Sequence, residues 1–226
     1  MVDKIEDLYA RARHATRECE NEKAYRYYKE IQKIDANNWE ANFMIVYFEA
    51  INTPANNIWA ASVSVLNIEN KIFCDIRDEI KEEEKEKAIK AVCDGLSQIA
   101  DKFTKDAKNK FDKTYKSIKS DFISEYVNNM TVAAEIMYLC GDSLNSTFKE
   151  DYISDVITAW KKAIDINTMY MKFVSNRKEI EDTIKKYTTK IQKYDSGYKA
   201  PHVDLSESDE KGFTFKIKRL FGRISS

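Results

Sequence analysis

The chain has 226 residues, 33 % of them charged, and a formal net charge of −1. A balance so close to neutral excludes a general attraction to nucleic acid, because duplex binding requires clustered positive charge. Only 5 glycines and 2 prolines are present, which leaves few places for turns and predicts an all-α fold of long amphipathic helices.

The N-terminal part of the chain predicts three helices. The first two cover about 3–19 and 22–35, and Asn37 and Asn38 close the second. A third covers about 39–51 and ends at Asn52-Thr53-Pro54, because the residue before a proline disfavours the helical conformation. The first two helices form a hairpin whose packing positions carry small and large apolar residues: Leu8, Ala12, Ala15, Ala24, Tyr28 and Ile31.

These positions give residues 5–38 a resemblance to a tetratricopeptide repeat, a helix–turn–helix unit of about 34 residues. The chain departs from the repeat at Arg11, where Leu is expected, at Cys19, which often is Gly, and at Ala36, which usually is Pro. A second repeat begins at Trp39 but lacks the matching second helix. The resemblance implies a helical scaffold that binds proteins rather than a catalyst, and it requires the rest of the chain to cover the repeat's open side.

Five further helices are predicted at about 56–80, 84–118, 121–140, 149–174 and 177–194, because apolar residues recur there in steps of three and four. Gly141 is expected to end the third of them as a left-handed cap. Together these helices predict an up-and-down bundle. The predicted organisation is a repeat-like domain over 1–52, a helical bundle over 53–195, and a flexible linker and tail over 196–226.

The segments YYKEIQKIDANNWEA, AWKKAIDI and IQKYDSGYKAP also resemble a group of bacterial proteins with an N-terminal repeat pair and a longer helical body. That resemblance implies the fold and no activity. Because the N-terminus lacks a signal-type apolar run and no stretch reaches about 18 apolar residues, a cytoplasmic protein is expected.

No catalytic or metal-binding motif is present in the sequence. Cys19, Cys74, Cys93 and Cys140 are far apart without a C-x-x-C pair, so we expect reduced, mostly buried thiols and neither a structural zinc site nor another cofactor. His14 precedes Cys19 by five residues, which places the two on different sides of a helix and disfavours a Cys–His dyad. The protein is therefore predicted not to be an enzyme. The alternative is an active site assembled from distant helices.

The resemblance to the repeat implies a partner-binding face along its first helix and the helix after it. The register places Thr16 and Glu40 on this face, and the residues predicted to bind a protein or peptide partner are Tyr9, Arg13, Arg17, Phe43 and Tyr47. Arginine and aromatic side chains dominate binding hot spots. In the alternative interpretation, these residues pack against the protein's own later helices.

The C-terminal segment KGFTFKIKRLFGRISS predicts a second interaction. Its apolar residues Ile217, Leu220, Phe221 and Ile224 share one helical face, and basic residues cover the other. The residues predicted to contact a membrane or a second partner are Lys216, Lys218, Arg219, Phe221 and Arg223. Three interpretations stay open: an anionic membrane surface, a protein partner or the chain's own groove, and no function.

The sequence thus predicts a non-catalytic protein–protein interaction scaffold or adaptor. The alternative is a peripheral protein that its basic amphipathic tail anchors at the inner face of the membrane.

Overall fold

The structure is a computed structural model and describes residues 2–114, 120–174 and 177–203. Over these ranges it contains α-helices, short 3₁₀ turns and no strand, which confirms the predicted all-α class. The helices are α1 (Val2–Arg17), α2 (Asn21–Ile34), α3 (Trp39–Ile51), α4 (Ile58–Glu79), α5 (Glu82–Thr114), α6 (Ser120–Phe148), α7 (Ile153–Tyr170) and α8 (Lys178–Gln192). The 3₁₀ turns are η1 (Ala55–Asn57), before α4, and η3 (Met171–Phe173), after α7.

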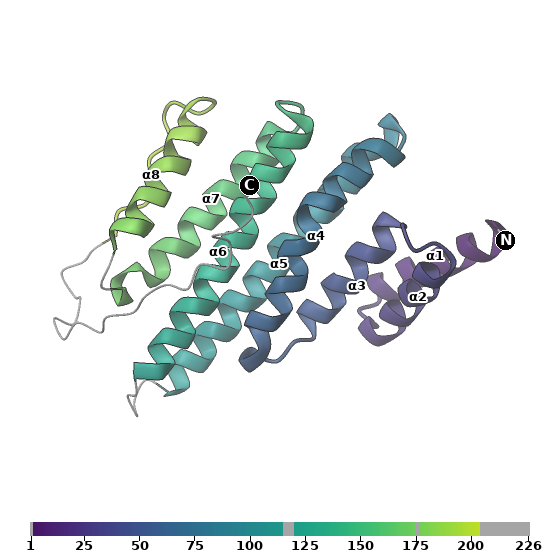
Figure 1. The fold of residues 1–226 in the computed structure, drawn as a ribbon, viewed down its shortest axis with the longest axis horizontal. Coiled ribbons are helices and arrows are strands. Elements are labelled where there is room, and N and C mark those ends of the chain that lie inside the picture. Colours follow the sequence, from purple (N-terminus) through teal and green to yellow (C-terminus); the bar gives the residue numbers. More distant parts are fainter. Residues whose placement is uncertain (1, 115–119, 175–176, 204–226) are drawn as a thin grey trace.

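The helices lie side by side in chain order, from α1 and α2 at one end to α8 at the other (Figure 1). Each packs on the next in an up-and-down arrangement. In addition, α3 contacts α5, α4 contacts α6 and α5 contacts α7. The helices α3, α5 and α7 therefore form one row, and α4 and α6 belong to a second row that packs against it. No helix among the described residues has the length and apolarity that crossing a membrane requires.

The first hairpin forms a small core of its own with one side of α3. All six apolar positions that carry the repeat resemblance are at most 5 % exposed: Leu8, Ala12, Ala15, Ala24, Tyr28 and Ile31. Cys19, which stands where the repeat often has glycine, adopts a left-handed conformation with φ of 57°. The backbone N–H of Glu20 then donates to the carbonyl of Ala15 at 2.9 Å, which closes α1 as a left-handed cap normally does.

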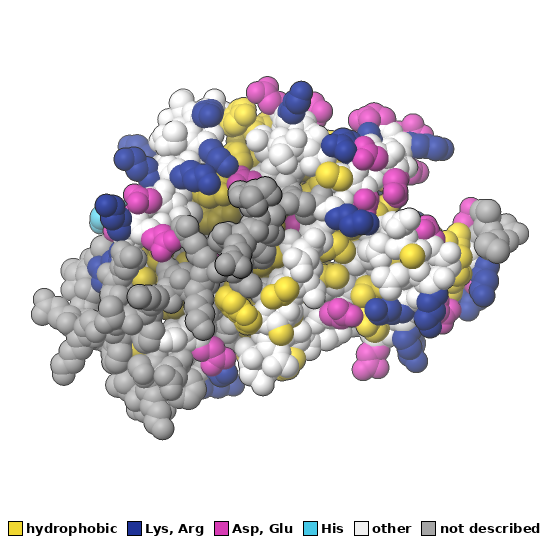
Figure 2. All heavy atoms as spheres, in the orientation of Figure 1, with side chains coloured by type: hydrophobic (Ala, Val, Ile, Leu, Met, Phe, Trp, Pro, Cys, Tyr) yellow, Lys and Arg dark blue, Asp and Glu magenta, His cyan; other side chains and the backbone are white. Residues whose placement is uncertain are grey.

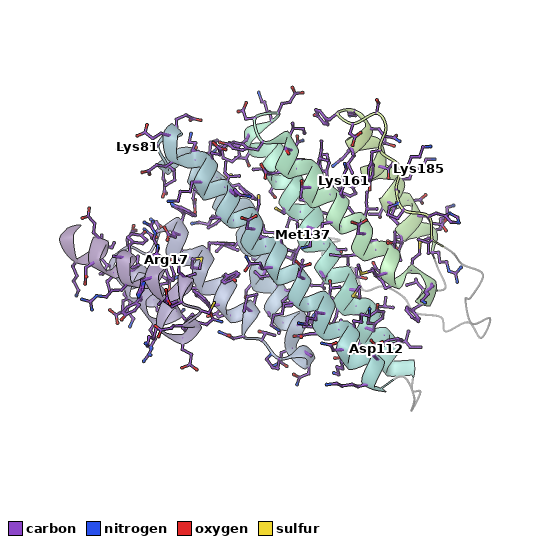
Figure 3. The ribbon with its side chains drawn as sticks, turned by 180° about the vertical axis from the view of Figure 1, so that it is seen from behind. Arg17, Lys81, Asp112, Met137, Lys161 and Lys185 are labelled. Atoms are coloured by element: carbon purple, nitrogen blue, oxygen red, sulfur yellow. The ribbon has the colours of Figure 1, made fainter. Side chains whose placement is uncertain are left out.

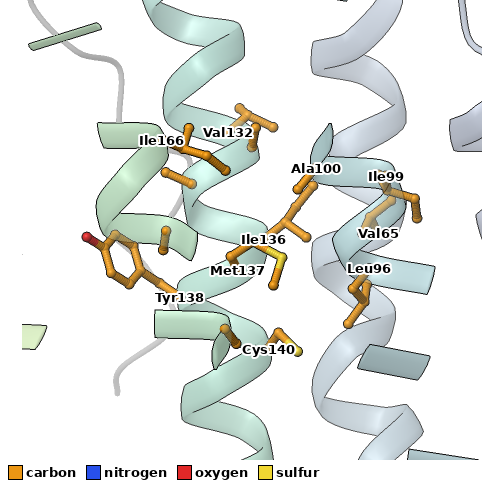
Figure 4. Close-up of a cluster of buried hydrophobic side chains, with 14 of the residues drawn as sticks. Val65, Leu96, Ile99, Ala100, Val132, Ile136, Met137, Tyr138, Cys140 and Ile166 are labelled. Atoms are coloured by element: carbon orange, nitrogen blue, oxygen red, sulfur yellow. The ribbon is translucent and has the colours of Figure 1, made fainter. Parts of the chain in front are cut away.

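The main core lies between α4, α5, α6 and α7. The predicted stripes are buried there: Val65 of α4, Leu96 of α5 and Met137 of α6 are each at most 2 % exposed. Figure 4 shows these side chains meeting between the helices. Because α6 is covered on several sides, it is apolar around much of its circumference rather than along one stripe, as expected for a central helix.

The third N-terminal helix joins the two cores. On α3, Ile45 and Phe48 belong to the hairpin core, whereas Phe43 and Ala50 belong to the main core. The contact with α5 is close, since a Cβ at Gly95 would come within 2.8 Å of the Phe43 ring. The helices on either side of residue 52 are thus packed together. The division into domains at that residue stays a prediction.

The predicted end of the long central helix was wrong. Gly141 was expected to cap this helix, but α6 continues to Phe148, and Gly141 is buried inside it. The reason is tertiary packing: a Cβ at Gly141 would lie 2.5 Å from Nε1 of Trp160 on α7. The glycine allows α6 and α7 to approach, which outweighs its poor helix propensity of about 1 kcal/mol.

Replacing Gly141 by alanine tests this close approach. Gly141→Ala should lower the free energy of unfolding by about 1–3 kcal/mol, the usual cost of overpacking a core, despite alanine's better helix propensity. Urea denaturation followed by circular dichroism measures the effect. Gly197→Ala is the matched control, because a Cβ there meets only Asp195 Oδ1, at 3.7 Å. A Gly141→Ala variant as stable as the control would contradict the packing explanation.

Candidate functional site

The predicted partner-binding residues at the N-terminus are held in a polar network. The Tyr9 hydroxyl donates to Asn38 Oδ1 at 2.6 Å, and the same oxygen accepts the Ala41 backbone N–H at 3.0 Å, which caps α3. The Arg13 guanidinium lies 4.8 Å from the centre of the Tyr9 ring. Burial, and then the nearby Glu40 carboxylate, raise the pKa of Tyr9 to about 12, so the phenol stays neutral and can donate.

Glu40 organises the centre of this network. Arg13 donates to its carboxylate with two nitrogens, Nε at 2.9 Å and Nη2, a bidentate ion pair between α1 and α3. The buried Tyr28 of α2 donates to Glu40 Oε1 at 3.1 Å. One carboxylate thus connects three helices. Glu40 is only 13 % exposed, whereas Arg13 is 56 % exposed, so the guanidinium keeps one side open to solvent.

Phe43 and Tyr47, the two predicted partner residues on α3, differ in their surroundings. Phe43 is 3 % exposed and packs on Gly95, so it belongs to the core and offers no surface to a partner. Tyr47 is half-buried, and its hydroxyl donates to Gln98 Oε1 of α5 at 2.6 Å. The alternative interpretation, in which these residues pack on later helices, therefore describes Phe43 fully and Tyr47 in part.

A further polar link joins α5 to α7 and extends the same row. Lys162 of α7 donates to Ser97 Oγ at 2.6 Å and pairs with Asp101 at 2.7 Å. Partly exposed polar pairs thus join α1 to α3, α3 to α5 and α5 to α7. We call the surface formed by these pairs the odd-helix face; its residues are Tyr9, Arg13, Glu40, Tyr47, Gln98, Asp101 and Lys162. In Figure 3, α5 extends from near Lys81 to Asp112, and Arg17 and Lys161 lie on opposite sides of it.

Arg17, the remaining predicted residue, lies at the end of α1 and is exposed. It makes no hydrogen bond or ion pair with any residue that the structure describes, so its charge is available to a ligand. The predicted tail residues Lys216, Lys218, Arg219, Phe221 and Arg223 lie outside the described residues, and their membrane or partner contacts stay a prediction.

A second polar cluster, which no sequence motif indicated, is centred on Asp142 of α6. Its carboxylate accepts from Trp160 Nε1 at 3.0 Å, from the Tyr187 hydroxyl at 2.7 Å and from Lys190 Nζ at 2.7 Å. Lys190 also lies over both aromatic rings. The cluster fastens α7 and α8 to α6. A sequence signal existed: Asp142 directly follows the apolar series of α6, where a lone carboxylate needs partners.

A buried acidic residue on α4 was likewise not predicted from the sequence. Glu69 is 0 % exposed, and neither carboxylate oxygen has a hydrogen-bond partner among the described residues. Burial, and then its electrostatic interaction with Cys93, raise the pKa of Glu69 well above its usual 4.5. The signal was again the spacing, since position 69 lies four residues after Val65 and three before Ile72, on the apolar stripe.

The cysteines are less buried than expected. Only Cys140 is fully buried; Cys19 is exposed, and Cys74 and Cys93 are partly exposed. The Sγ atoms of Cys93 and Cys140 are 3.9 Å apart. Across the described part of the chain, no group of three or more His, Cys, Asp or Glu side chains is arranged to hold a metal ion.

Two hollows in the described surface are open. One, about 310 Å³, lies beside Trp59 and is lined by asparagine, serine and glutamate side chains of η1 and α6. Another, about 90 Å³, lies between α6, α7 and α8 near Tyr138 and Tyr170. Charges of both signs alternate around the face shown in Figure 2, with apolar atoms between the helices. The ordered side chains of the odd-helix face are therefore the best candidate for a binding surface.

Comparison with protein-family models, with curated proteins and with solved structures found no match to this chain.

Removing the Asp142 carboxylate tests its role in joining α7 and α8 to α6. Asp142→Ala should cost about 2–3 kcal/mol of unfolding free energy, because it leaves the Trp160 N–H and Tyr187 hydroxyl without their acceptor. Lys190→Ala should cost about 1 kcal/mol or less, since that ion pair is about one-third exposed. Urea denaturation of both variants gives the comparison. Equal losses would mean that the ion pair, and not the buried hydrogen bonds, carries the cluster.

Burial of Glu69 predicts a pH dependence of stability. The folded protein keeps this carboxyl protonated at pH values where the unfolded chain has released the proton, because the folded pKa is raised above 4.5. The free energy of unfolding should therefore fall as pH rises from 4.5 toward the folded pKa, by at most about 1.4 kcal/mol per pH unit.

Glu69→Gln should remove this loss, so the stability of the variant relative to the unaltered protein should increase as pH rises from about 5 to about 8. The free energy of unfolding is measured at intervals of about one pH unit. Denaturation curves over that range measure the difference, and Glu79→Gln, at an exposed site, is the control. A constant difference between Glu69→Gln and the unaltered protein across pH would show that Glu69 is charged in the folded state.

Proposed function

We propose that the protein is a non-catalytic interaction scaffold that binds a protein or peptide partner on the odd-helix face and the adjoining Arg17. The observation that carries the proposal is the series of polar pairs across this face: Arg13 with Glu40, Tyr47 with Gln98, and Lys162 with Asp101. They come from four helices, and each pair joins two of them: α1 to α3, α3 to α5 and α5 to α7.

Order in these side chains favours binding. A side chain that is already fixed by a neighbour loses less conformational entropy when a partner arrives, and this preorganisation raises affinity. The pairs stay partly exposed, so they can still exchange or share hydrogen bonds with a ligand. Arg13, for example, pairs with Glu40, yet its side chain is 56 % exposed.

The residue types on the face fit a polypeptide. Tyr9 and Tyr47 present half-buried rings that are held by hydrogen bonds, and Arg13 and Arg17 add planar cations. Arginine and tyrosine are the side chains most often found at the energetic centre of protein interfaces. The six buried packing positions of the first hairpin support the tetratricopeptide interpretation, in which the corresponding face binds peptides.

Site-specific cross-linking tests this proposal in the full-length protein. A photoreactive amino acid replaces Asp94, an exposed residue one turn from Gln98 on α5, and the protein is irradiated in the cells that express it. We expect a discrete covalent adduct with another protein. Charge reversal at Arg17 should reduce its yield several-fold, because the interface loses a cation.

The control for this experiment is a second arginine in the same hairpin. Arg26 is exposed on α2, which contributes no residue to the odd-helix face, and among the described residues its guanidinium donates to the Glu22 carbonyl of its own helix. Arg26→Glu should leave the adduct unchanged. The absence of a protein adduct at position 94, or equal losses for Arg17→Glu and Arg26→Glu, would contradict the proposal.

A further inference from the structure

Two thiols lie close together between α5 and α6 and interact electrostatically with a buried carboxyl group. Cys93 of α5 and Cys140 of α6 are 47 positions apart in sequence, yet their Sγ atoms are 3.9 Å apart. In Figure 4, Cys140 points from α6 into the space between α6 and the helices that carry Val65 and Leu96. The two remaining cysteines, Cys19 and Cys74, form no such pair.

The surroundings of this pair are not purely apolar. Glu69 of α4 is fully buried with both carboxylate oxygens unpartnered among the described residues, and it interacts electrostatically with both thiols. A buried polar group without a partner is costly, at about 1–3 kcal/mol. Its presence beside two thiols marks the position as more than ordinary packing, since an apolar side chain would fill it without that cost.

The two thiols differ in access. Cys140 is 0 % exposed, whereas Cys93 is partly exposed. The pKa of Cys140 is raised, chiefly by its contact with the Cys93 sulfur and by burial, which disfavours its thiolate. An oxidant that arrives from solvent therefore reaches Cys93 first, and Cys140 is placed to attack the oxidised sulfur.

We propose that Cys93 and Cys140 are a redox modification site, at which a hydroperoxide converts the two thiols into an intrachain disulfide. The Cys93 sulfur attacks one peroxide oxygen, the O–O bond breaks, and Cys93 sulfenic acid and water form when hydrogen peroxide is the oxidant. The Cys140 sulfur then attacks the Cys93 sulfur. An S–S bond forms, the S–O bond breaks, and the hydroxide released takes the Cys140 proton and leaves as a second water. The two thiols lose two electrons and the peroxide gains them.

The two sulfurs already lie close to each other, so the bond requires only a short movement. The sulfurs must approach from 3.9 Å to a disulfide length of about 2 Å, a movement within reach of side-chain rotation and small helix shifts. The product would join α5 to α6, which already pack against each other along much of their length. It would also restrict the unfolded chain between the two positions, so oxidation should raise the melting temperature.

The experiment uses the folded, full-length protein with hydrogen peroxide as the oxidant. After oxidation, free thiols are blocked with N-ethylmaleimide and the chain is digested for mass spectrometry. We expect a peptide pair linked through Cys93 and Cys140, two blocked cysteines per chain instead of four, reversal by dithiothreitol, and a melting temperature several degrees higher before reduction.

Cysteine variants separate this pair from the other two thiols. Cys93→Ser and Cys140→Ser should each abolish the linked peptide, whereas Cys19→Ser and Cys74→Ser should leave it unchanged. Because Cys140→Ser alters a buried position, the partly exposed Cys93→Ser, with its fold checked by circular dichroism, is the decisive variant. Absence of the linked peptide, or oxidation of Cys93 to sulfinic acid while Cys140 stays a free thiol, would overturn the proposal. Neither result depends on the scaffold function.

Discussion

The burial of α6 is the constraint on which the rest of the structure depends. This helix contacts α4, α5 and α7 through its apolar sides and α8 through Asp142. A helix in such a position must be apolar around most of its surface, and each polar group that it carries must find a partner. The close approach of α7 at Gly141, and the hydrogen bond from Trp160 to Asp142 one residue later, satisfy both demands at the same place.

The polar groups of the interior divide into two kinds. Most are paired: the Asn167 amide donates to the Tyr138 hydroxyl at 2.8 Å and accepts from the Tyr170 hydroxyl at 2.7 Å, which gives α6 and α7 a defined register. Some are not: the hydroxyls of Thr104 and Thr188 lack a hydrogen-bond partner among the described residues, and so does the fully buried carboxyl of Glu69. Paired groups stabilise and specify a core, whereas an unpaired one lowers stability and is retained only where something else requires it. The unpaired Glu69 interacts electrostatically with Cys93 and Cys140, the two thiols proposed as a redox site.

On the surface, the side chains of the odd-helix face are held by one another and still stay partly exposed to solvent. Its ion pairs and hydrogen bonds are partly exposed, so each adds little to the stability of the fold. Their effect is to hold arginine, tyrosine and amide side chains in fixed positions across several helices. That is the property expected of a surface that receives a partner, and it depends on side chains from α1 to α7 rather than on the first hairpin alone.

Much of the fold followed from the sequence, because helical periodicity is a local property. The steps of three and four that place Ile89, Val92 and Leu96 on one side of α5 predicted their burial, and the breaker at Pro54 predicted the end of α3. The candidate site was less predictable. A repeat register placed Tyr9 and Arg13 on one face but assigned Phe43 to that face too, because a single hairpin pattern contains no information on the helix that covers it.

What the sequence by itself determined is therefore the class of fold, the order of the helices and the apolar side of each, since these depend on composition and on residue spacing within one helix. Tertiary structure alone decided that Gly141 continues a helix, that Phe43 is core, that Asp142 joins three helices, and that Cys93 lies beside Cys140. Each of these depends on contacts between residues far apart in the chain. Such contacts arise from the packing of whole helices, and local propensity does not encode them.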